Sequence, residues 1–114
     1  FEAMNKAIGR LSEYINFDTE KTLVLVDGPH KIKKFPFKQL PIIGGDGKSL
    51  SIACASIFAK VVRDNWMNIL ELSYPEYGFS KHKGYGTKFH LEALKEHGPS
   101  PIHRRSFAPV KSLC

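Results

Sequence analysis

Two aspartates stand where short apolar runs meet glycine, and they are the residues best suited to chemistry. Asp27 follows the run 23–26 and precedes Gly28, and Asp46 follows the run 40–43 and two glycines. A carboxylate at the tip of a buried strand is costly to desolvate unless something pairs with it, and a divalent cation is a common partner. Two such tips side by side predict metal-assisted chemistry on phosphate.

The alternative for either aspartate is a simple turn, because Asp-Gly is a common turn sequence. The aliphatic residues before Asp27 leave its carboxylate at a buried rim, which favours a metal ligand over a turn at that position. In an open α/β sheet, ligand-binding residues gather at the carboxyl ends of strands, where both aspartates lie. Two-metal hydrolysis of a phosphodiester holds its ions about 3.5–4 Å apart and needs bridging and flanking carboxylates, so these two are part of the required set.

Residues 44–49, Gly-Gly-Asp-Gly-Lys-Ser, are similar to a phosphate-binding loop that opens a helix. The full nucleotide-binding signature requires glycine where Ile42 stands, so a nucleoside triphosphatase is excluded. Backbone N–H groups at a helix start still attract phosphate, and Lys48 with Ser49 or Ser51 would complete a seat for one phosphate. Ordinary helix capping by the same residues explains the segment equally well.

A second glycine-rich segment, residues 82–87, places Tyr85 between two glycines. Such a loop can approach a ligand closely, so that the Tyr85 ring stacks on a base or sugar while Lys83 meets a phosphate. The alternative is a turn whose Tyr85 packs on the core. The basic residues of segment 103–107 form either a phosphate-contacting strip or a solvated tail.

Other residues of metal-ligating or titratable type predict structural roles. The five histidines show no helical pairing on an apolar face, and none is predicted to bind metal. Asp64, beside Arg63 in a helical segment, is predicted to form a structural ion pair or hydrogen bond. The two cysteines, Cys54 and Cys114, form no metal-spaced pair, which favours a reduced intracellular setting with Cys54 as a small core residue.

The charge balance favours a polyanionic partner. Seventeen Lys and Arg against eleven Asp and Glu give a net charge of +6 in 114 residues. Nucleic acid is the usual partner of such a surface, although a basic surface kept for solubility explains the charge as well. No apolar stretch approaches the roughly 20 residues needed to cross a bilayer.

The hydrophobic pattern predicts helix, strand, strand, helix, helix, which is an α/β order. We expect a helix over residues 1–15, strands over 23–27 and 41–44 with a loop over 28–40 between them, a long helix within 48–73, and a helix over 87–97 capped by Thr87 and stopped by Gly98. The long helix is expected to bury a stripe made of Ile52, Ala55, Phe58, Ala59, Val62, Trp66, Ile69 and Leu70. Two short strands cannot form a stable sheet alone, so further strands are expected N-terminal to them.

A set of motifs resembles ribonuclease HII, in the order of that family and across nearly the whole chain. The motifs are Val26–Gly28, Gly45–Ser49, Ser51–Val61, Arg63-Asp64, Tyr74-Pro75, Tyr77–Phe79, His82–Tyr85 and His103–Val110. The ordered set is specific, whereas each motif alone is not.

The resemblance implies an α/β ribonuclease H-like fold, here an incomplete mixed sheet with flanking helices and without the N-terminal strands. It implies a Mg²⁺- or Mn²⁺-dependent endonuclease that hydrolyses the RNA strand of RNA–DNA hybrids and single ribonucleotides in duplex DNA, leaving 5′-phosphate and 3′-hydroxyl ends. The family's site has four carboxylates, of which Asp27 matches the third and Asp46 the fourth. Tyr85 matches the tyrosine that packs on the sugar at the RNA–DNA junction and helps to sense the 2′-hydroxyl.

The chain departs from the family pattern at its start. The family's first strand carries an Asp-Glu pair followed by Gly-Arg-Gly, whereas the only Gly-Arg here is Gly9-Arg10, in a predicted helix. Residues 1–114 are therefore expected to be the C-terminal part of a single ribonuclease HII domain, inactive alone, in a monomeric cytoplasmic enzyme. Gly44 and Pro29 replace a lysine and an asparagine of the family, which affects fine substrate contacts. A non-catalytic basic nucleic-acid-binding module and a phosphate-binding metabolic domain are the alternative functions.

Overall fold

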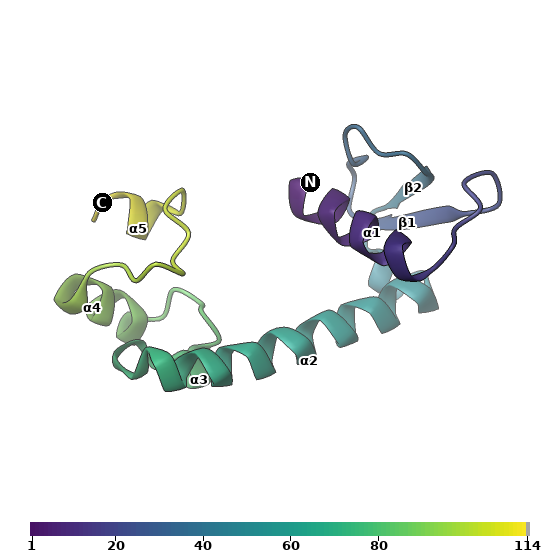
Figure 1. Cartoon of the computed structure of the whole chain (residues 1–114). Coiled ribbons are helices and arrows are strands. Elements are labelled where there is room, and N and C mark those ends of the chain that lie inside the picture. The colour runs from purple at the N-terminus through teal and green to yellow at the C-terminus, as the bar shows by residue number, and fades with distance from the viewer. Residues whose placement is uncertain (114) are drawn as a thin grey trace. The chain divides into compact units, whose positions relative to one another are not determined.

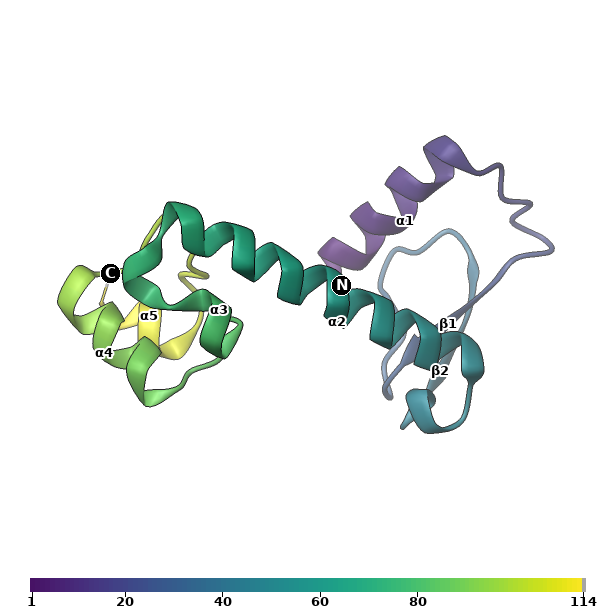
Figure 2. The same cartoon turned by 90° about the horizontal axis from the view of Figure 1, so that it is seen from below.

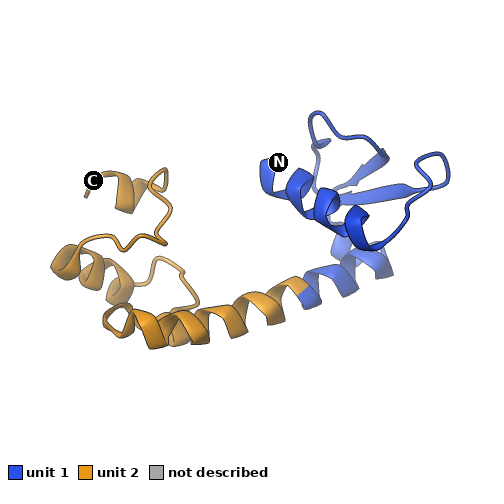
Figure 3. Cartoon of the chain, in the orientation of Figure 1, with its two compact units in different colours: residues 1–58 blue, residues 59–114 orange. Residues whose placement is uncertain are grey.

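The chain is an α/β protein that forms two compact units, residues 1–58 and residues 59–114 (Figure 3). The computed structural model describes residues 1–113, so Cys114 lies outside the described residues. The predicted α/β class is confirmed, because helices flank a two-stranded sheet. No helix within residues 1–113 is both long enough and apolar enough to span a bilayer.

The first unit holds the sheet (Figure 1). Its elements are α1 (Glu2–Tyr14), β1 (Leu23–Asp27), β2 (Lys38–Ile42), the 3-10 turn η1 (Gly45–Gly47) and the first turns of α2 (Leu50–Ser73). The strands run parallel and lie side by side in both views (Figures 1 and 2), with Leu23 opposite Lys38 and Asp27 opposite Ile42. Both strands therefore carry their carboxyl ends to the same edge of the sheet.

The second strand begins earlier than the sequence pattern predicts. Strand β2 covers Lys38–Ile42 rather than residues 41–44, because Pro41 sits inside the strand opposite Val26 instead of opening it. Proline is tolerated on an edge strand, where its missing N–H is not needed by a neighbour. The side chain of Gln39 also anchors the connection before β2, since it donates to the Ile32 carbonyl at 2.9 Å and accepts from the Ile32 N–H at 2.7 Å.

The second unit is helical. It contains the rest of α2, the 3-10 turn η2 (Pro75–Tyr77), α3 (Phe79–His82), α4 (Lys88–His97) and α5 (Ala108–Lys111). Figure 2 shows α3 and α4 beside the C-terminal end of α2. The core of this unit consists of Tyr77, Phe79, Ala93, Leu94 and Val110.

The predicted ends of α4 are confirmed. Thr87 is the N-cap, and its hydroxyl accepts a hydrogen bond from the His90 N–H at 3.3 Å. Gly98 ends the helix with φ of 74°, a conformation that favours glycine.

Gly78 has φ of 67°, and a Cβ there would lie 2.5 Å from the ring of Phe89. Glycine at position 78 therefore lets η2 pack against α4.

The predicted burial of α2 is wrong for this chain. Ile52 is the one fully buried residue of the helix, whereas Phe58 is 73% and Trp66 is 59% exposed. Cys54 is exposed too, and Leu23 of β1 is 56% exposed although its strand was expected to be buried. Periodicity identifies the residues that share one face, but only neighbouring segments can cover that face.

Candidate functional site

Asp27 is tied directly to the turn that carries Asp46. Its Oδ1 atom accepts a hydrogen bond of 2.9 Å from the N–H of Gly45, the residue before Asp46. The register of the sheet supports this contact, because the Gly28 N–H continues the pairing by donating to the Ile42 carbonyl at 2.9 Å. The structure therefore brings the carboxyl end of β1 against turn η1 within the first unit.

Both carboxylates are exposed in this chain. Asp46 accepts a hydrogen bond from the next residue, with 3.0 Å between its Oδ1 and the Gly47 nitrogen. The expectation that Asp27 stands at a buried rim is wrong here, because Leu23 and its neighbours on β1 are only partly covered. Exposure removes the desolvation cost of the two charges and leaves carboxylate oxygens accessible to a cation.

Asp27 and Asp46 fit part of a divalent-metal site. Carboxylate oxygens are the hard ligands that Mg²⁺ and Mn²⁺ prefer. Within residues 1–113, however, no group of three or more His, Cys, Asp or Glu side chains comes together that could hold an ion. The donor chemistry therefore fits such a metal, and a complete site requires ligands beyond these two residues.

Gly45 is the close-packed residue of this site. It is buried, and a Cβ built on it would lie 2.5 Å from Cδ1 of Ile52 and 3.1 Å from Oδ1 of Asp27. We expect Gly45→Ala in the intact protein to lower the free energy of unfolding by about 1–3 kcal/mol, because overpacking displaces Ile52 and Asp27. Urea unfolding measures this change.

Gly47→Ala is the matched control for that prediction. Gly47 lies in the same turn, and a Cβ there would meet nothing within 4 Å. The free energy of unfolding of Gly47→Ala is expected to stay within about 0.5 kcal/mol of the value for the parent protein, as for most surface substitutions. If both variants lost the same free energy of unfolding, the close packing of Gly45 against Asp27 and Ile52 would not be the cause of the loss.

Lys48 and Ser51 lie at the start of α2, also in the first unit. The Lys48 ammonium donates to the carbonyl of Ile43 at 2.8 Å and thereby stabilises the end of β2. An ammonium group has three donors, so two stay available to a phosphate. Ser51 is exposed on the first turn of the helix. Both side chains are placed where an anion can reach them.

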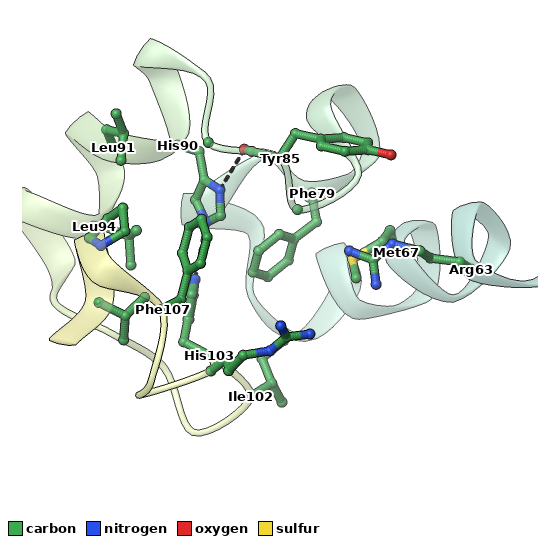
Figure 4. A pocket seen from close by; sticks show the side chains of 15 residues that line it. Arg63, Met67, Phe79, Tyr85, His90, Leu91, Leu94, Ile102, His103 and Phe107 are labelled. Carbon is green, nitrogen blue, oxygen red and sulfur yellow. Dashed lines mark hydrogen bonds between the residues drawn. The ribbon is translucent and has the colours of Figure 1, made fainter. Parts of the chain in front are cut away.

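Tyr85 belongs to the second unit and presents its ring to solvent. The side chain is 70% exposed, so the alternative in which Tyr85 packs on the core is wrong. Lys83 and Gly84 both have positive φ, 52° and 82°, which turns the backbone sharply just before Tyr85. Figure 4 shows the Tyr85 hydroxyl directed away from His90, while the Tyr85 carbonyl faces that ring.

Lys83 is more constrained than the sequence suggested. Its ammonium donates to the side-chain oxygen of Asn68, and its carbonyl accepts from the Arg63 guanidinium at 3.1 Å. These contacts join the loop to α2 within the second unit. Lys83 is therefore partly engaged in holding the loop, which limits how far its charge can move toward a ligand.

A pocket of about 430 Å³ opens beside Tyr85 (Figure 4). Its walls include Phe79 and Phe107, and the guanidinium-bearing residues Arg63 and Arg104 line it as well. Aromatic walls with cationic groups suit a nucleotide, since rings stack on bases and guanidinium groups bind phosphate. The basic segment 103–107 thus contributes to the pocket rather than forming only a solvated tail.

Asp64 forms the structural ion pair that its position predicted. Its carboxylate lies 2.6 Å from the Lys60 ammonium, one helical turn away on α2. The hydrogen bond from Lys60 lowers the pKa of Asp64 below its ordinary value. The pair is largely solvent-exposed and so contributes little to stability.

Three histidines meet in the second unit, and no sequence pattern predicted that they lie together. His82 and His90 are buried, and their rings stack with centroids 4.4 Å apart. His103 approaches from the C-terminal segment, with its Nε2 atom 3.1 Å from Nε2 of His90. Spacings of eight and thirteen residues across three elements carry no periodic signal, so only the tertiary structure reveals this cluster.

The chain is of the α/β class, with Asp27 at the end of β1 and Asp46 in the turn after β2, at the sheet edge where open α/β proteins commonly bind ligands. The sequence model of the family named Ribonuclease HII matches residues 2–110. This chain therefore belongs to the ribonuclease HII family, and its α/β structure is consistent with the ribonuclease H-like fold of that family.

Similar proteins named Ribonuclease HII support the assignment. The protein of Endomicrobium trichonymphae is 50% identical over 113 residues, covering 99% of this chain and 51% of the relative. The protein of Chlamydia caviae is 52% identical over 112 residues, covering 98% and 49%. That of Caldanaerobacter subterraneus subsp. tengcongensis is 53% identical over 106 residues, covering 93% and 41%. The chain thus spans about half the length of these relatives.

Proposed function

We propose that this chain is the C-terminal part of a single ribonuclease HII domain. The whole protein would be a metal-dependent endonuclease that hydrolyses the RNA strand of RNA–DNA hybrids and single ribonucleotides in duplex DNA. It would leave 5′-phosphate and 3′-hydroxyl ends. The observation that carries this proposal is the hydrogen bond from Gly45 to Asp27, which sets two accessible carboxylates on neighbouring elements.

The proposed roles follow from the placement of each residue. Asp27 and Asp46 would bind Mg²⁺ or Mn²⁺ together with carboxylates outside residues 1–114. When bound there, a divalent ion would supply charge that favours activation of a water molecule and departure of the leaving oxygen. Lys48 and Ser51 would steady a backbone phosphate, because both lie exposed at the start of α2.

The second unit would recognise the substrate. The exposed Tyr85 ring can pack on the sugar at an RNA–DNA junction, and Lys83 can add a positive charge beside the nucleic-acid backbone. The net charge of +6 favours such a polyanion. Free, exposed Cys54 fits a reducing compartment, and we propose a monomer that works in the cytoplasm.

Exposed apolar surface supports the proposal of a larger single domain. Leu23 on β1 and Phe58 and Trp66 on α2 are each more than half exposed, although their side chains are of the type that forms cores. A two-stranded sheet is also below the size of an independently stable one. Additional strands paired with β1 would extend the sheet, and further segments of a larger domain would cover the exposed apolar side chains.

The test is cleavage by the intact protein of a DNA duplex that contains one ribonucleotide. We expect cleavage with Mg²⁺ or Mn²⁺, no detectable cleavage in excess EDTA, and recovery when metal is restored, because metal supplies several kcal/mol of charge stabilisation. The 3′ end should be extendable by a polymerase. Cyclic phosphate ends would contradict the proposal, because they would mean that the ribose 2′-hydroxyl, rather than water, attacks.

A non-catalytic nucleic-acid-binding module is the second candidate, and the basic charge favours it. Such a module would bind all-DNA and ribonucleotide-containing duplexes with salt-dependent affinity and hydrolyse neither. A phosphate-binding metabolic domain would show no salt-dependent affinity for duplexes. The cleavage assay, combined with a salt titration of binding, separates the three functions.

A further inference from the structure

A chain of hydrogen bonds links the backbone of the Tyr85 loop to the C-terminal segment. The Tyr85 carbonyl lies 2.8 Å from Nδ1 of His90, and Nε2 of His90 lies 3.1 Å from Nε2 of His103. At the far end, Nδ1 of His103 lies 3.0 Å from the Ser100 nitrogen and 2.7 Å from its hydroxyl oxygen. We refer to His90, His103 and Ser100 as the histidine relay.

The pattern of donors and acceptors assigns one proton to each ring. The Ser100 N–H can only donate, so Nδ1 of His103 is an acceptor and the proton sits on Nε2. That proton is donated to Nε2 of His90, which leaves the His90 proton on Nδ1, facing the Tyr85 carbonyl. All the links of the relay are satisfied together only when both rings are neutral.

His82 is held in the same way beside the relay. Its Nδ1 accepts from the Gly84 N–H at 3.2 Å, and its Nε2 donates to the Tyr77 carbonyl at 2.6 Å. Its ring stacks on His90. Gly84 and Tyr85, the two loop residues after Lys83, are therefore held by imidazole rings whose nitrogen atoms are all engaged.

The surroundings disfavour a positive charge on the rings of His90 and His103. The groups that line the same pocket include Arg63 from α2 and Arg104 from the C-terminal segment, both cations, and no carboxylate lines it within the described residues. From α2, Glu71 is electrostatically coupled to His82, but it accepts hydrogen bonds from Ser80. Burial lowers the pKa of both His90 and His103. The rings thus stay neutral to lower pH than an ordinary histidine.

We propose that His90, oriented by His103 and Ser100, is a positioning residue that holds the Tyr85 loop in its substrate-ready shape only while the relay is neutral. This inference rests on the proposed role of Tyr85 at the RNA–DNA junction. Protonation of His90 would set its Nε2 proton against the Nε2 proton of His103 and break the link. The His90 ring would then lose the partner that orients it, and its Nδ1–H would no longer be held in line with the Tyr85 carbonyl.

The first test is independent of activity. Long-range ¹H–¹⁵N correlation spectra of the intact protein at pH 7.5 report which nitrogen of each histidine carries the proton. We expect neutral Nδ1–H for His90 and neutral Nε2–H for His103. A charged ring, or the other tautomer, at His90 or His103 would overturn the inference.

The second test measures selectivity, as the ratio of kcat/KM on a single-ribonucleotide duplex to kcat/KM on a continuous RNA–DNA hybrid. Because one hydrogen bond is lost, we expect His90→Leu to lower this ratio about tenfold. His90→Asn keeps a donor near the position of Nδ1 and should hold the ratio within about threefold. His97→Gln is the matched control, since His97 lies on the same helix outside the relay.

The acid dependence of the same ratio completes the test. In the parent protein the selectivity ratio should fall only at a pH below about 6.5, the ordinary histidine pKa. The reason is that burial lowers the pKa values of His90 and His103. His90→Asn cannot titrate and should keep its ratio over that range. The relay is supported if the two profiles diverge, and it is overturned if they coincide.

A Tyr85→Ala variant separates this inference from the proposed function. If Tyr85→Ala lowers the ratio and His90→Leu does not, the relay is overturned while the role of Tyr85 stands. If Tyr85→Ala leaves the ratio unchanged, the proposed recognition role fails and the inference fails with it. A lower ratio in both Tyr85→Ala and His90→Leu supports the inference.

Discussion

Replacement of Asp27 by asparagine in the intact protein is expected to lower kcat at least about a thousandfold while duplex binding stays within about threefold. A metal ion contributes several kcal/mol of charge stabilisation to phosphodiester hydrolysis, and each 1.36 kcal/mol is a factor of ten in rate. Asparagine keeps an oxygen that can accept the Gly45 N–H, so the contact between β1 and turn η1 survives. The loss would therefore report the missing charge rather than a disturbed turn.

Single-turnover cleavage of a duplex with one ribonucleotide measures the rate, and binding to the same duplex in Ca²⁺ measures affinity. Asp18→Asn is the matched control in the same unit, because Asp18 is an acidic surface residue paired with Lys21 at 3.3 Å. It should cleave at the parent rate. An Asp27→Asn variant that cleaves within tenfold of the parent protein would remove Asp27 from the catalytic site.

The secondary structure that depends on local sequence could be predicted. Residues 23–27 form a strand because a run of aliphatic side chains ends at a residue typical of turns. The limits of α4 follow from Thr87, whose hydroxyl caps the first turn, and from Gly98, whose positive φ stops the helix. Each of these signals acts within a few residues of the position it determines.

Burial could not be predicted in the same way. The side chains of Phe58, Val62 and Trp66 follow a helical period, yet all three are more than half exposed. Periodicity shows which side chains share a face, whereas the covering segment can lie anywhere in the fold. The start of β2 was missed for a related reason, since Pro41 is acceptable in a strand that pairs on one side only within the described residues.

For the candidate site, sequence predicted which residues to consider but not how they are held. That Asp27 would lie against the turn carrying Asp46 follows from parallel strands ending at one edge, and the contact with Gly45 agrees. The exposure of Tyr85 and the neutral histidine relay depend on packing between α3, α4 and the C-terminal segment. Contacts across such distances in sequence leave no trace in residue spacing.

The purified chain of residues 1–114 is expected to show no detectable hydrolysis of a ribonucleotide-containing duplex in Mg²⁺ or Mn²⁺. Two-metal hydrolysis needs bridging and flanking ligands around both ions. Asp27 and Asp46 supply two carboxylates, and no third His, Cys, Asp or Glu within the described part of the chain joins them in a metal-binding group. Without the remaining metal ligands neither ion is held in place, so hydrolysis is expected to be lost completely rather than in part.

Binding and cleavage must be measured together for this prediction. The basic charge should still give the isolated chain salt-dependent affinity for duplexes, so binding without cleavage shows that the preparation is competent. Addition of the N-terminal half as a separate polypeptide should restore measurable cleavage if the exposed faces of β1 and α2 are the ones it covers. Reproducible cleavage by residues 1–114 alone, abolished by Asp46→Asn, would instead mean that two carboxylates suffice and that the proposed division of the site is wrong.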